Sequence, residues 1–285
     1  MSTLSKIGRL PVALTLLILG SSQLGISAAA TAAPKTTFYR PKVAVKAKTL
    51  QATDVAVVNA ASYLPGISPG GLITIFGNNL SSVTGIVVAG TDPLPNELAG
   101  VSVLINGLYA PVFAVAYANG EDQVSVQVPY ETAVGPGAAL IDVYNNGVLE
   151  ASVRVDSFTE APGIFMYDGT YAVAVRYADG SVTGPTNPAF PGDILTLYTT
   201  GLGPLTLNLV DGVGAPFDPL AYTQDPFTVT VAGEQCQVLF SGLAPGYVGL
   251  YQLNIVLPSD LPRGNLDMQI TSPYASSGVA ILPVN

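Results

Sequence analysis

The stretch Gln123-Val124-Ser125-Val126-Gln127-Val128-Pro129 alternates polar and apolar residues with a period of two. This alternation puts apolar side chains on one face of an extended chain and polar ones on the other, which predicts a half-buried β-strand. Runs of the same kind, separated by Gly, Pro, Asn and Asp, follow one another from about residue 53. No long stretch has helical periodicity, so the sequence predicts an all-β protein.

Three landmarks occur twice, in the same order. The strand at Gln123–Pro129 matches Gln252–Pro258, and two earlier segments match in the same way: Pro69–Phe76 with Pro191–Tyr198, and Val103–Gly107 with Val229–Gly233. The distance between matching positions changes little, so a tandem duplication with small loop insertions explains the pattern better than chance similarity among strands. We predict two immunoglobulin-like β-sandwiches, at residues 53–157 and 158–285, each large enough to bury its own core.

The N-terminal 33 residues have the layout of a secretory signal peptide. Lys6 and Arg9 precede an apolar run, and small residues follow from Ser27 to Ala33. The apolar run is about half of the ~20 residues that a membrane-spanning helix needs, so an anchor is the less favoured alternative. We predict cleavage after Ala30, Ala32 or Ala33 and a secreted or cell-surface location without a membrane span.

Composition excludes several classes of function. The chain has no His, so it cannot use a Ser-His-Asp or Cys-His mechanism or bind a metal through imidazole. A single Cys cannot form an internal disulfide or a thiolate zinc cluster. The net charge of −9 argues against a nucleic acid partner, because phosphate binding requires clustered Lys and Arg.

Charge is distributed unevenly along the chain. Five basic residues stand between positions 35 and 48, whereas all nineteen acidic residues lie from Asp54 onward, with only Arg154, Arg176 and Arg263 beside them. Residues 34–52 therefore form a basic leader that precedes a strongly acidic body.

The leader also has a strand pattern. Its small apolar residues Val43, Val45 and Ala47 alternate with positions that include Lys46 and Lys48. An extended segment of this kind can add to the open edge of a β-sheet, and donation between neighbouring molecules produces filaments. The alternatives are a solvated linker and a segment that folds back onto the first sandwich.

Six motifs stand out within about residues 57–285: Val58–Tyr63, Ile67–Gly77, Leu98–Val101, Thr200–Pro204, Gly242–Asn254 and Pro262–Leu266. In combination they resemble the acidobacterial (Solibacter-type) secreted C-terminal domain family, and each half is similar to IPT/TIG immunoglobulin-like modules. It implies an immunoglobulin-like fold in each half. The family has no assigned activity, so the resemblance implies no catalytic residues.

Two motifs could suggest catalysis, and neither holds. Gly66–Gly70 fits the Gly-x-Ser-x-Gly pattern of a nucleophile elbow, but that motif needs a histidine base and a turn into a helix. Glu121 and Asp122 form the nearest adjacent pair of acids, which we expect in a solvated loop and not in a glycosidase site. We therefore predict that the protein is not an enzyme and has no cofactor.

Three weaker features remain. Asp211 and Asp218 flank a turn-rich segment that could supply oxygen ligands to a structural calcium ion. Cys236 alternates with Val238 and Phe240, which predicts a buried, inert thiol. The 14 tyrosines suit packing on strand faces, and some could stack on sugars.

These observations favour a non-enzymatic extracellular structural or adhesive protein. We predict that it self-associates, or binds other extracellular proteins, as a filament or surface-layer subunit, with the leader as the docking strand. The alternative is a binding module for an extracellular carbohydrate or cell-wall polymer.

Overall fold

The computed structural model describes residues 55–285, so the predicted signal peptide and the leader with its docking strand lie outside the described residues. Within this range the secondary structure consists of strands and turns, and no helix is present. A helix of the length and apolarity that a bilayer crossing requires is accordingly missing from residues 55–285. The all-β prediction is confirmed.

The first half, which we name unit 1, contains ten strands in two facing sheets. One sheet has the order β1-β2-β8-β7-β3, and the other has the order β10-β9-β5-β4 with β6 beside β5. The strands are β1 (Ala56–Asn59), β2 (Leu72–Gly77), β3 (Ile86–Val88), β4 (Glu97–Leu98), β5 (Val101–Ile105), β6 (Leu108–Ala110), β7 (Val112–Ala118), β8 (Glu121–Gln127), β9 (Gly135–Asn145) and β10 (Val148–Ser157).

The second half, unit 2, repeats this arrangement. Its sheets have the orders β11-β15-β19-β18, with β14 also beside β15, and β12-β13-β21-β20-β16-β17. The strands are β11 (Gly163–Ile164), β12 (Met166–Tyr167), β13 (Tyr171–Ala172), β14 (Ala174–Arg176), β15 (Ile194–Thr200), β16 (Thr228–Val231), β17 (Glu234–Gln235), β18 (Gln237–Leu243), β19 (Tyr251–Val256), β20 (Gly264–Thr271) and β21 (Ala280–Val284).

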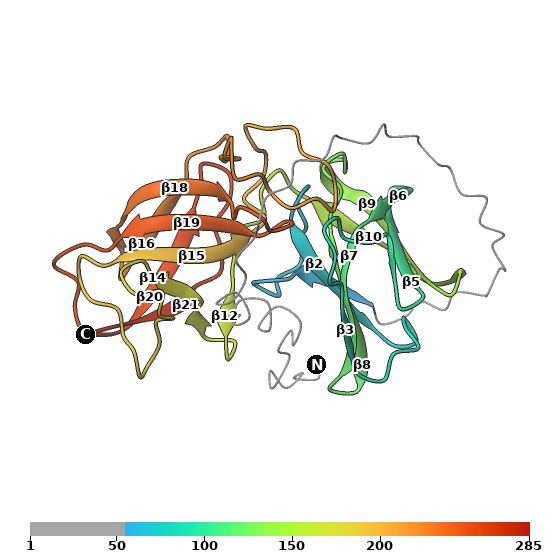
Figure 1. Ribbon diagram of the computed structural model, residues 1–285, viewed down its shortest axis with the longest axis horizontal. Helices are drawn as coiled ribbons and strands as arrows, with labels where there is room; N and C mark the ends of the chain where they lie inside the picture. The colour runs from blue at the N-terminus through green and yellow to red at the C-terminus, as the bar shows by residue number, and fades with distance from the viewer. Residues whose placement is uncertain (1–54) are drawn as a thin grey trace.

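Both units have the strand order of an immunoglobulin domain, in which strands A, B, E and D form one sheet and G, F and C the other. In unit 1 these are β1, β2, β8 and β7 against β10, β9 and β5; in unit 2 they are β11, β15, β19 and β18 against β21, β20 and β16. The prediction of tandem immunoglobulin-like β-sandwiches is therefore confirmed. Figure 1 shows the two units side by side along the long axis of the molecule.

The three sequence landmarks fall on equivalent strands. The first pair lies on β2 and β15 (strand B), the second on β5 and β16 (strand C), and the third on β8 and β19 (strand E). A parallel bridge between the segment before strand B and the end of strand G also occurs in each unit, at Ile67↔Ser157 and Ala189↔Val284. Duplication of one ancestral unit, which remains a prediction, accounts for all of these correspondences.

Alternating side chains of the facing sheets fill each core. In β5, Val101, Val103 and Ile105 are fully buried, whereas the intervening residues are half-buried. Strand β19 repeats this pattern with Tyr251, Leu253 and Ile255. The alternation that the sequence shows is thus the alternation between core and surface.

The tight turn between β9 and β10 follows from local chemistry. Asn146 and Gly147 both have positive φ, at 49° and 75°, and Val148 pairs with Asn145 directly across the turn. A two-residue hairpin with this geometry favours Asn followed by Gly, because glycine has no Cβ to clash there. The sequence Asn145-Asn146-Gly147 therefore specifies this hairpin.

Candidate functional site

The two units are joined by an apolar layer of their own, separate from the two cores. Unit 1 contributes residues from the turn after β1, the start of β2, the connection between β3 and β4, and β7. Unit 2 contributes residues between β11 and β14 and between β18 and β19. The buried members of this junction cluster are Ala60, Ala61, Leu72, Leu94, Phe113, Ala114, Phe165, Val173, Ala244 and Leu250. Burial of apolar surface of this extent stabilises one fixed arrangement of the units.

Buried hydrogen bonds fix the registry of the junction. The Thr200 hydroxyl accepts a bond of 2.8 Å from the Leu72 amide and donates one of 2.9 Å to the Gly249 carbonyl. Asn59 Nδ2 donates to the Ala161 carbonyl at 2.7 Å. Because these groups are shielded from water in the junction, a substitution that removes one partner would leave the other buried and unsatisfied, at a cost of about 1–3 kcal/mol.

A long loop of unit 2, residues 201–227, extends over unit 1 and is named the junction loop (upper centre of Figure 1). Its Gly212 amide donates to Gln127 Oε1 and its Gly212 carbonyl accepts from the Leu94 amide, both at 2.7 Å. The Tyr130 amide donates to Asp211 Oδ1 at 2.9 Å. The loop therefore ties the end of β8 in unit 1 to the body of unit 2.

A groove of about 510 Å³ lies between unit 1 and the junction loop, and we name it the junction groove. Its walls combine aliphatic side chains with hydroxyl, amide and carboxyl groups. The lining residues are Pro69, Tyr130, Glu131, Thr132, Val134, Thr159, Gly203, Pro204, Leu205, Leu207, Asn208, Leu209 and Gln224. These groups can hydrogen-bond a ligand, but the lining contains no imidazole, thiol or amine to act as nucleophile or base.

Asp211 does not line the groove, but it accepts the hydrogen bond from the amide of the lining residue Tyr130. Burial raises the pKa of its carboxyl group to about 6, the Tyr130 amide opposes that rise, and the neighbouring Glu131 adds to it. Asp218, the other predicted calcium ligand, is exposed and precedes a cis-proline. No group of three or more acidic or thiol side chains gathers anywhere in residues 55–285. The calcium site at Asp211 and Asp218 remains a prediction.

The raised pKa of Asp211 predicts a pH dependence of stability. Between about pH 4 and pH 6 the folded protein binds a proton that the unfolded chain does not, so the free energy of unfolding falls as pH rises through this window. Asp211→Asn keeps the oxygen that accepts the Tyr130 bond and removes the charge. We expect it to raise the free energy of unfolding at pH 7 by about 1 kcal/mol, a modest gain because solvent screens the partly exposed carboxyl.

Urea unfolding followed by circular dichroism at pH 4.5 and pH 7 measures this effect. Asp218→Asn is the matched control, since it removes one negative charge from an exposed position of the same loop. The interpretation is wrong if Asp211→Asn gives the same difference between the two pH values as the wild-type chain.

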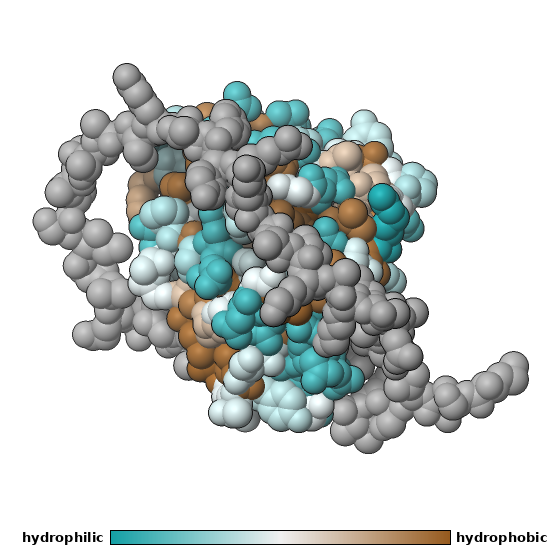
Figure 2. All heavy atoms as spheres, turned by 90° about the vertical axis from the view of Figure 1, so that its right-hand side faces the viewer, coloured by the Kyte–Doolittle hydropathy of each residue, from teal (hydrophilic) through white to brown (hydrophobic). Residues whose placement is uncertain are grey.

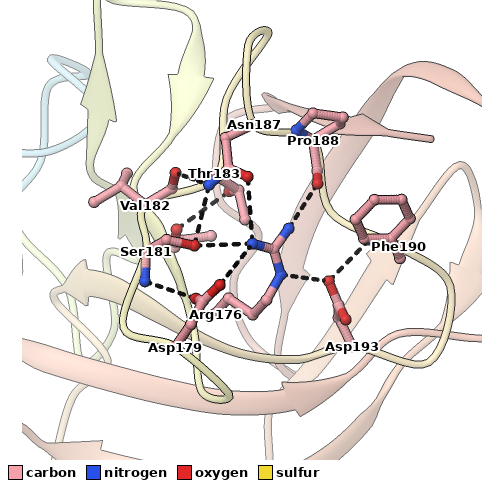
Figure 3. A network of polar contacts seen from close by, with 10 residues as sticks. Arg176, Asp179, Ser181, Val182, Thr183, Asn187, Pro188, Phe190 and Asp193 are labelled. Atoms are coloured by element: carbon pink, nitrogen blue, oxygen red, sulfur yellow. Dashed lines mark hydrogen bonds and ion pairs between the residues drawn. The ribbon is translucent and has the colours of Figure 1, made fainter.

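A second polar cluster surrounds Arg176 at the end of β14 (Figure 3). Arg176 is almost fully buried, with 7% of the residue exposed, and its Nε donates to Asp193 Oδ2 at 2.9 Å. It also donates from Nη1 to the Ser181 hydroxyl at 2.8 Å and from Nη2 to the Pro188 carbonyl at 2.7 Å. Because its donors are engaged within the protein, this arginine fixes the connection between β14 and β15 and offers no anion site.

The acidic pair Glu121 and Asp122 differs from the prediction that it lies in a solvated loop. Glu121 and Asp122 lie in β8, and Asp122 is buried. The Asp122 carboxylate accepts bonds from the Leu80 amide at 2.9 Å and the Ser81 hydroxyl at 2.8 Å. The expectation of a solvated loop was therefore wrong for Asp122. Its burial is compensated because it holds the connection between β2 and β3.

The remaining predicted residues occupy structural positions. Cys236 is buried in the core of unit 2, and burial raises the pKa of its thiol to about 11, so the prediction of a buried thiol is confirmed. Ser68 of the Gly-x-Ser-x-Gly match is buried in the connection between β1 and β2. Tyr177 and Tyr274 are the most exposed tyrosines of the described chain, and sugar binding by tyrosine remains a prediction.

Comparison with known proteins adds little to this picture. No family model matches the chain, and no curated protein matches its sequence. Similar solved structures include a titin I9–I11 tandem (13% identity, 77% of this chain and 62% of that chain, TM-score 0.20). A second is the Yersinia pseudotuberculosis adhesin InvE (10% identity, 81% of this chain and 58% of that chain, TM-score 0.22). A third is domains 4–9 of the surface layer protein SbsC (15% identity, 81% of this chain and 30% of that chain, TM-score 0.24).

The chain spans less than two thirds of each of these three structures. At such TM-scores the fold assignment rests on the strand order described above and not on the similarity. The junction cluster and the junction loop were not predicted from the sequence, because an apolar side chain does not specify whether it packs within its own sandwich or against the neighbouring one. Asp211 was singled out, but for calcium and not for its bond to Tyr130.

Proposed function

We propose that the protein is an exported, non-enzymatic structural or adhesive module that self-associates by strand addition. The leader of one molecule would add to an open sheet edge of the next. The observation that carries this proposal is β3, a short sheet edge that has no charge, no proline and no bulge.

Strand β3 is the outer strand of the sheet β1-β2-β8-β7-β3, and among residues 55–285 its only partner is β7. Its side chains Ile86 and Val88 are 42% and 36% exposed. The segment from Ser81 to Thr91 contains no charged residue and no proline. Natural edge strands are usually protected by charge, proline or bulges, so an uncharged, regular and apolar edge is suited to accept a further strand.

Two longer edge strands of the described chain, β10 and β18, carry such protection. Strand β10 has charged residues, including Arg154 and Asp156, and two register shifts. Strand β18 has a register shift between Val238 and Phe240. Figure 2, which looks onto the unit 1 end of the molecule, shows apolar patches between polar ones. These features favour β3 as the acceptor.

Topology and charge favour donation between molecules. The leader runs directly into β1, which is the opposite edge of the sheet that ends in β3. Its donation to β3 of a second copy would join sheets edge to edge in a head-to-tail series, which extends as a fibre where the rotation does not close. The basic leader and the acidic body also attract each other across molecules.

Sedimentation velocity over a concentration series, with electron microscopy of the same samples, tests the proposal. We expect mature protein that begins at residue 34 to assemble, and protein lacking residues 34–52 to remain monomeric. Ile86→Lys, which places a charge on the exposed edge of β3, should weaken association by about tenfold or more, equivalent to about 1.4 kcal/mol.

Leu239→Lys is the matched control, because Leu239 is also exposed but lies on the edge strand β18. It should associate like the wild-type protein. A mature chain that stays monomeric at high concentration, or a deletion that assembles equally well, would contradict the proposal.

A further inference from the structure

The junction groove has the size of a ligand site and lies where the two units meet. Its volume of about 510 Å³ falls within the roughly 300–1,000 Å³ of small-molecule sites, which occur preferentially at domain interfaces. None of its lining residues belongs to β3, so a ligand in the groove does not occupy the sheet edge that accepts a strand in the proposal above. The chemistry of the walls indicates which ligand the groove fits.

The wall formed by the junction loop is held in place by the fold of unit 2. Two arms of the loop pair with each other, and the Gln224 amide donates to the Pro204 carbonyl at 2.9 Å. The half-buried side chains of Leu207 and Leu209 pack against the core of unit 2. Because this wall is already ordered, a ligand binds there without the entropy cost of ordering a loop.

The polar groups of the lining include several that the protein itself does not use. Thr132 is 4% exposed, and its hydroxyl has no hydrogen-bond partner among residues 55–285. Gln224 Nε2 donates to the Leu205 carbonyl at 2.7 Å, which leaves Oε1 as an acceptor. Thr159 and Asn208 are exposed, and neither side chain has a hydrogen-bond partner within the described chain. Since buried polar groups are normally satisfied, the lone hydroxyl of Thr132 points to a ligand with hydrogen-bonding groups.

Charge restricts the class of ligand further. Glu131 is the one charged residue of the lining, and the arginines of the described chain (Arg154, Arg176 and Arg263) do not belong to it. Glu131 and the neighbouring Asp211 would repel an anionic ligand. The other polar groups of the lining are neutral amides and hydroxyls, which together both donate and accept. This combination matches an uncharged ligand that carries many hydroxyl groups.

We propose that the junction groove binds a neutral oligosaccharide, as one segment of an extracellular polysaccharide. The Asn208 amide and the Thr159 hydroxyl hydrogen-bond to sugar hydroxyls, and the Glu131 carboxylate accepts from two neighbouring hydroxyls. The aliphatic side chains of Val134, which is 51% exposed, and Leu207 contact the apolar face of a sugar ring.

Isothermal titration of the mature protein, which begins at residue 34, with neutral hexasaccharides tests the proposal. The probes are hexamers of β-1,4-linked glucose, β-1,4-linked mannose, α-1,4-linked glucose and β-1,4-linked N-acetylglucosamine, with hexagalacturonate as the anionic comparison. We expect at least one neutral hexamer to bind at a single site and hexagalacturonate to bind more weakly. Asn208→Leu should weaken binding by about tenfold, and Thr159→Trp, which fills the groove, should abolish it.

Asn265→Leu is the matched control, because Asn265 is an exposed asparagine of unit 2 that does not line the groove. It should bind like the wild-type protein, and circular dichroism should show all three variants folded. The proposal is overturned if no neutral hexamer binds at up to about 10 mM or if hexagalacturonate binds more tightly. Binding that Asn208→Leu and Thr159→Trp leave unchanged also overturns it, since the sugar would then lie elsewhere, for example on the exposed Tyr177 or Tyr274.

The same titration of protein lacking residues 34–52 separates this site from self-association, which that deletion removes. We expect the deletion to bind the sugar with an unchanged dissociation constant. Binding that occurs only after the deletion would instead identify the basic leader as the occupant of the groove and overturn the proposal.

Discussion

Replacing Arg176 with leucine is expected to lower the free energy of unfolding by about 3–5 kcal/mol. The substitution removes the donors that satisfy Asp193, Ser181 and the Pro188 carbonyl, and it leaves the Asp193 carboxylate largely buried without its counterion. The loss of the arginine contact over the Phe190 ring, at 5.6 Å, adds a smaller term. Urea unfolding monitored by circular dichroism measures the difference.

Arg263→Leu provides the matched control, because Arg263 is an exposed arginine of the same unit. An exposed substitution of this kind should change the free energy of unfolding by no more than about 0.5 kcal/mol. If the two variants were equally stable, the hydrogen-bonded cluster around Arg176 would not contribute to the stability of unit 2.

Gly201→Val should destabilise the junction between the units by about 3 kcal/mol or more. Gly201 has a φ of 78°, which a β-branched residue rarely adopts, and it directly follows β15 at the junction. A Cβ at this position would lie 2.2 Å from the Ala161 carbonyl oxygen and 3.2 Å from Asn59 Nδ2. The hydrogen bond from Asn59 to Ala161 and the apolar contacts beside it must therefore separate.

Gly233→Val distinguishes the clash from the backbone strain. Gly233 has a nearly identical φ of 83°, in the turn between β16 and β17, and a Cβ there would have no neighbour within 4 Å. This control should lose about 1–3 kcal/mol from strain alone. In scanning calorimetry, Gly201→Val should also split the single unfolding transition into two, one for each unit. A single transition for Gly201→Val, at the same temperature as for Gly233→Val, would contradict a clash at the junction.

The strands within each unit could be predicted because local patterns determine them. Alternation in Gln123–Pro129 and Gln252–Pro258 marks strand E of both units, and Asn146-Gly147 specifies the β9–β10 hairpin. These signals act over a few residues, where side-chain period and turn geometry have few alternatives.

There is a physical reason why the sequence does not predict the junction between the units. Leu72 and Phe113 look like ordinary core residues in the sequence, and only the assembled sheets show that they face unit 2.

The exposure of Asp122 was predicted wrongly because an acid beside a turn is usually solvated, and its partners Leu80 and Ser81 lie some forty positions earlier. Arg176 was noted only as one of the few basic residues, because its partners come from the folded loop around it.

Leu72 and Ile194 begin the same strand in the two halves, yet Leu72 is 4% exposed and Ile194 is 37% exposed. The two units have thus diverged at their contact, so that each presents a different face to the other and neither can replace the other. Swapping them, or lengthening the chain with another copy of either, would set mismatched faces against each other. Further divergence at this contact requires compensating substitutions on both sides.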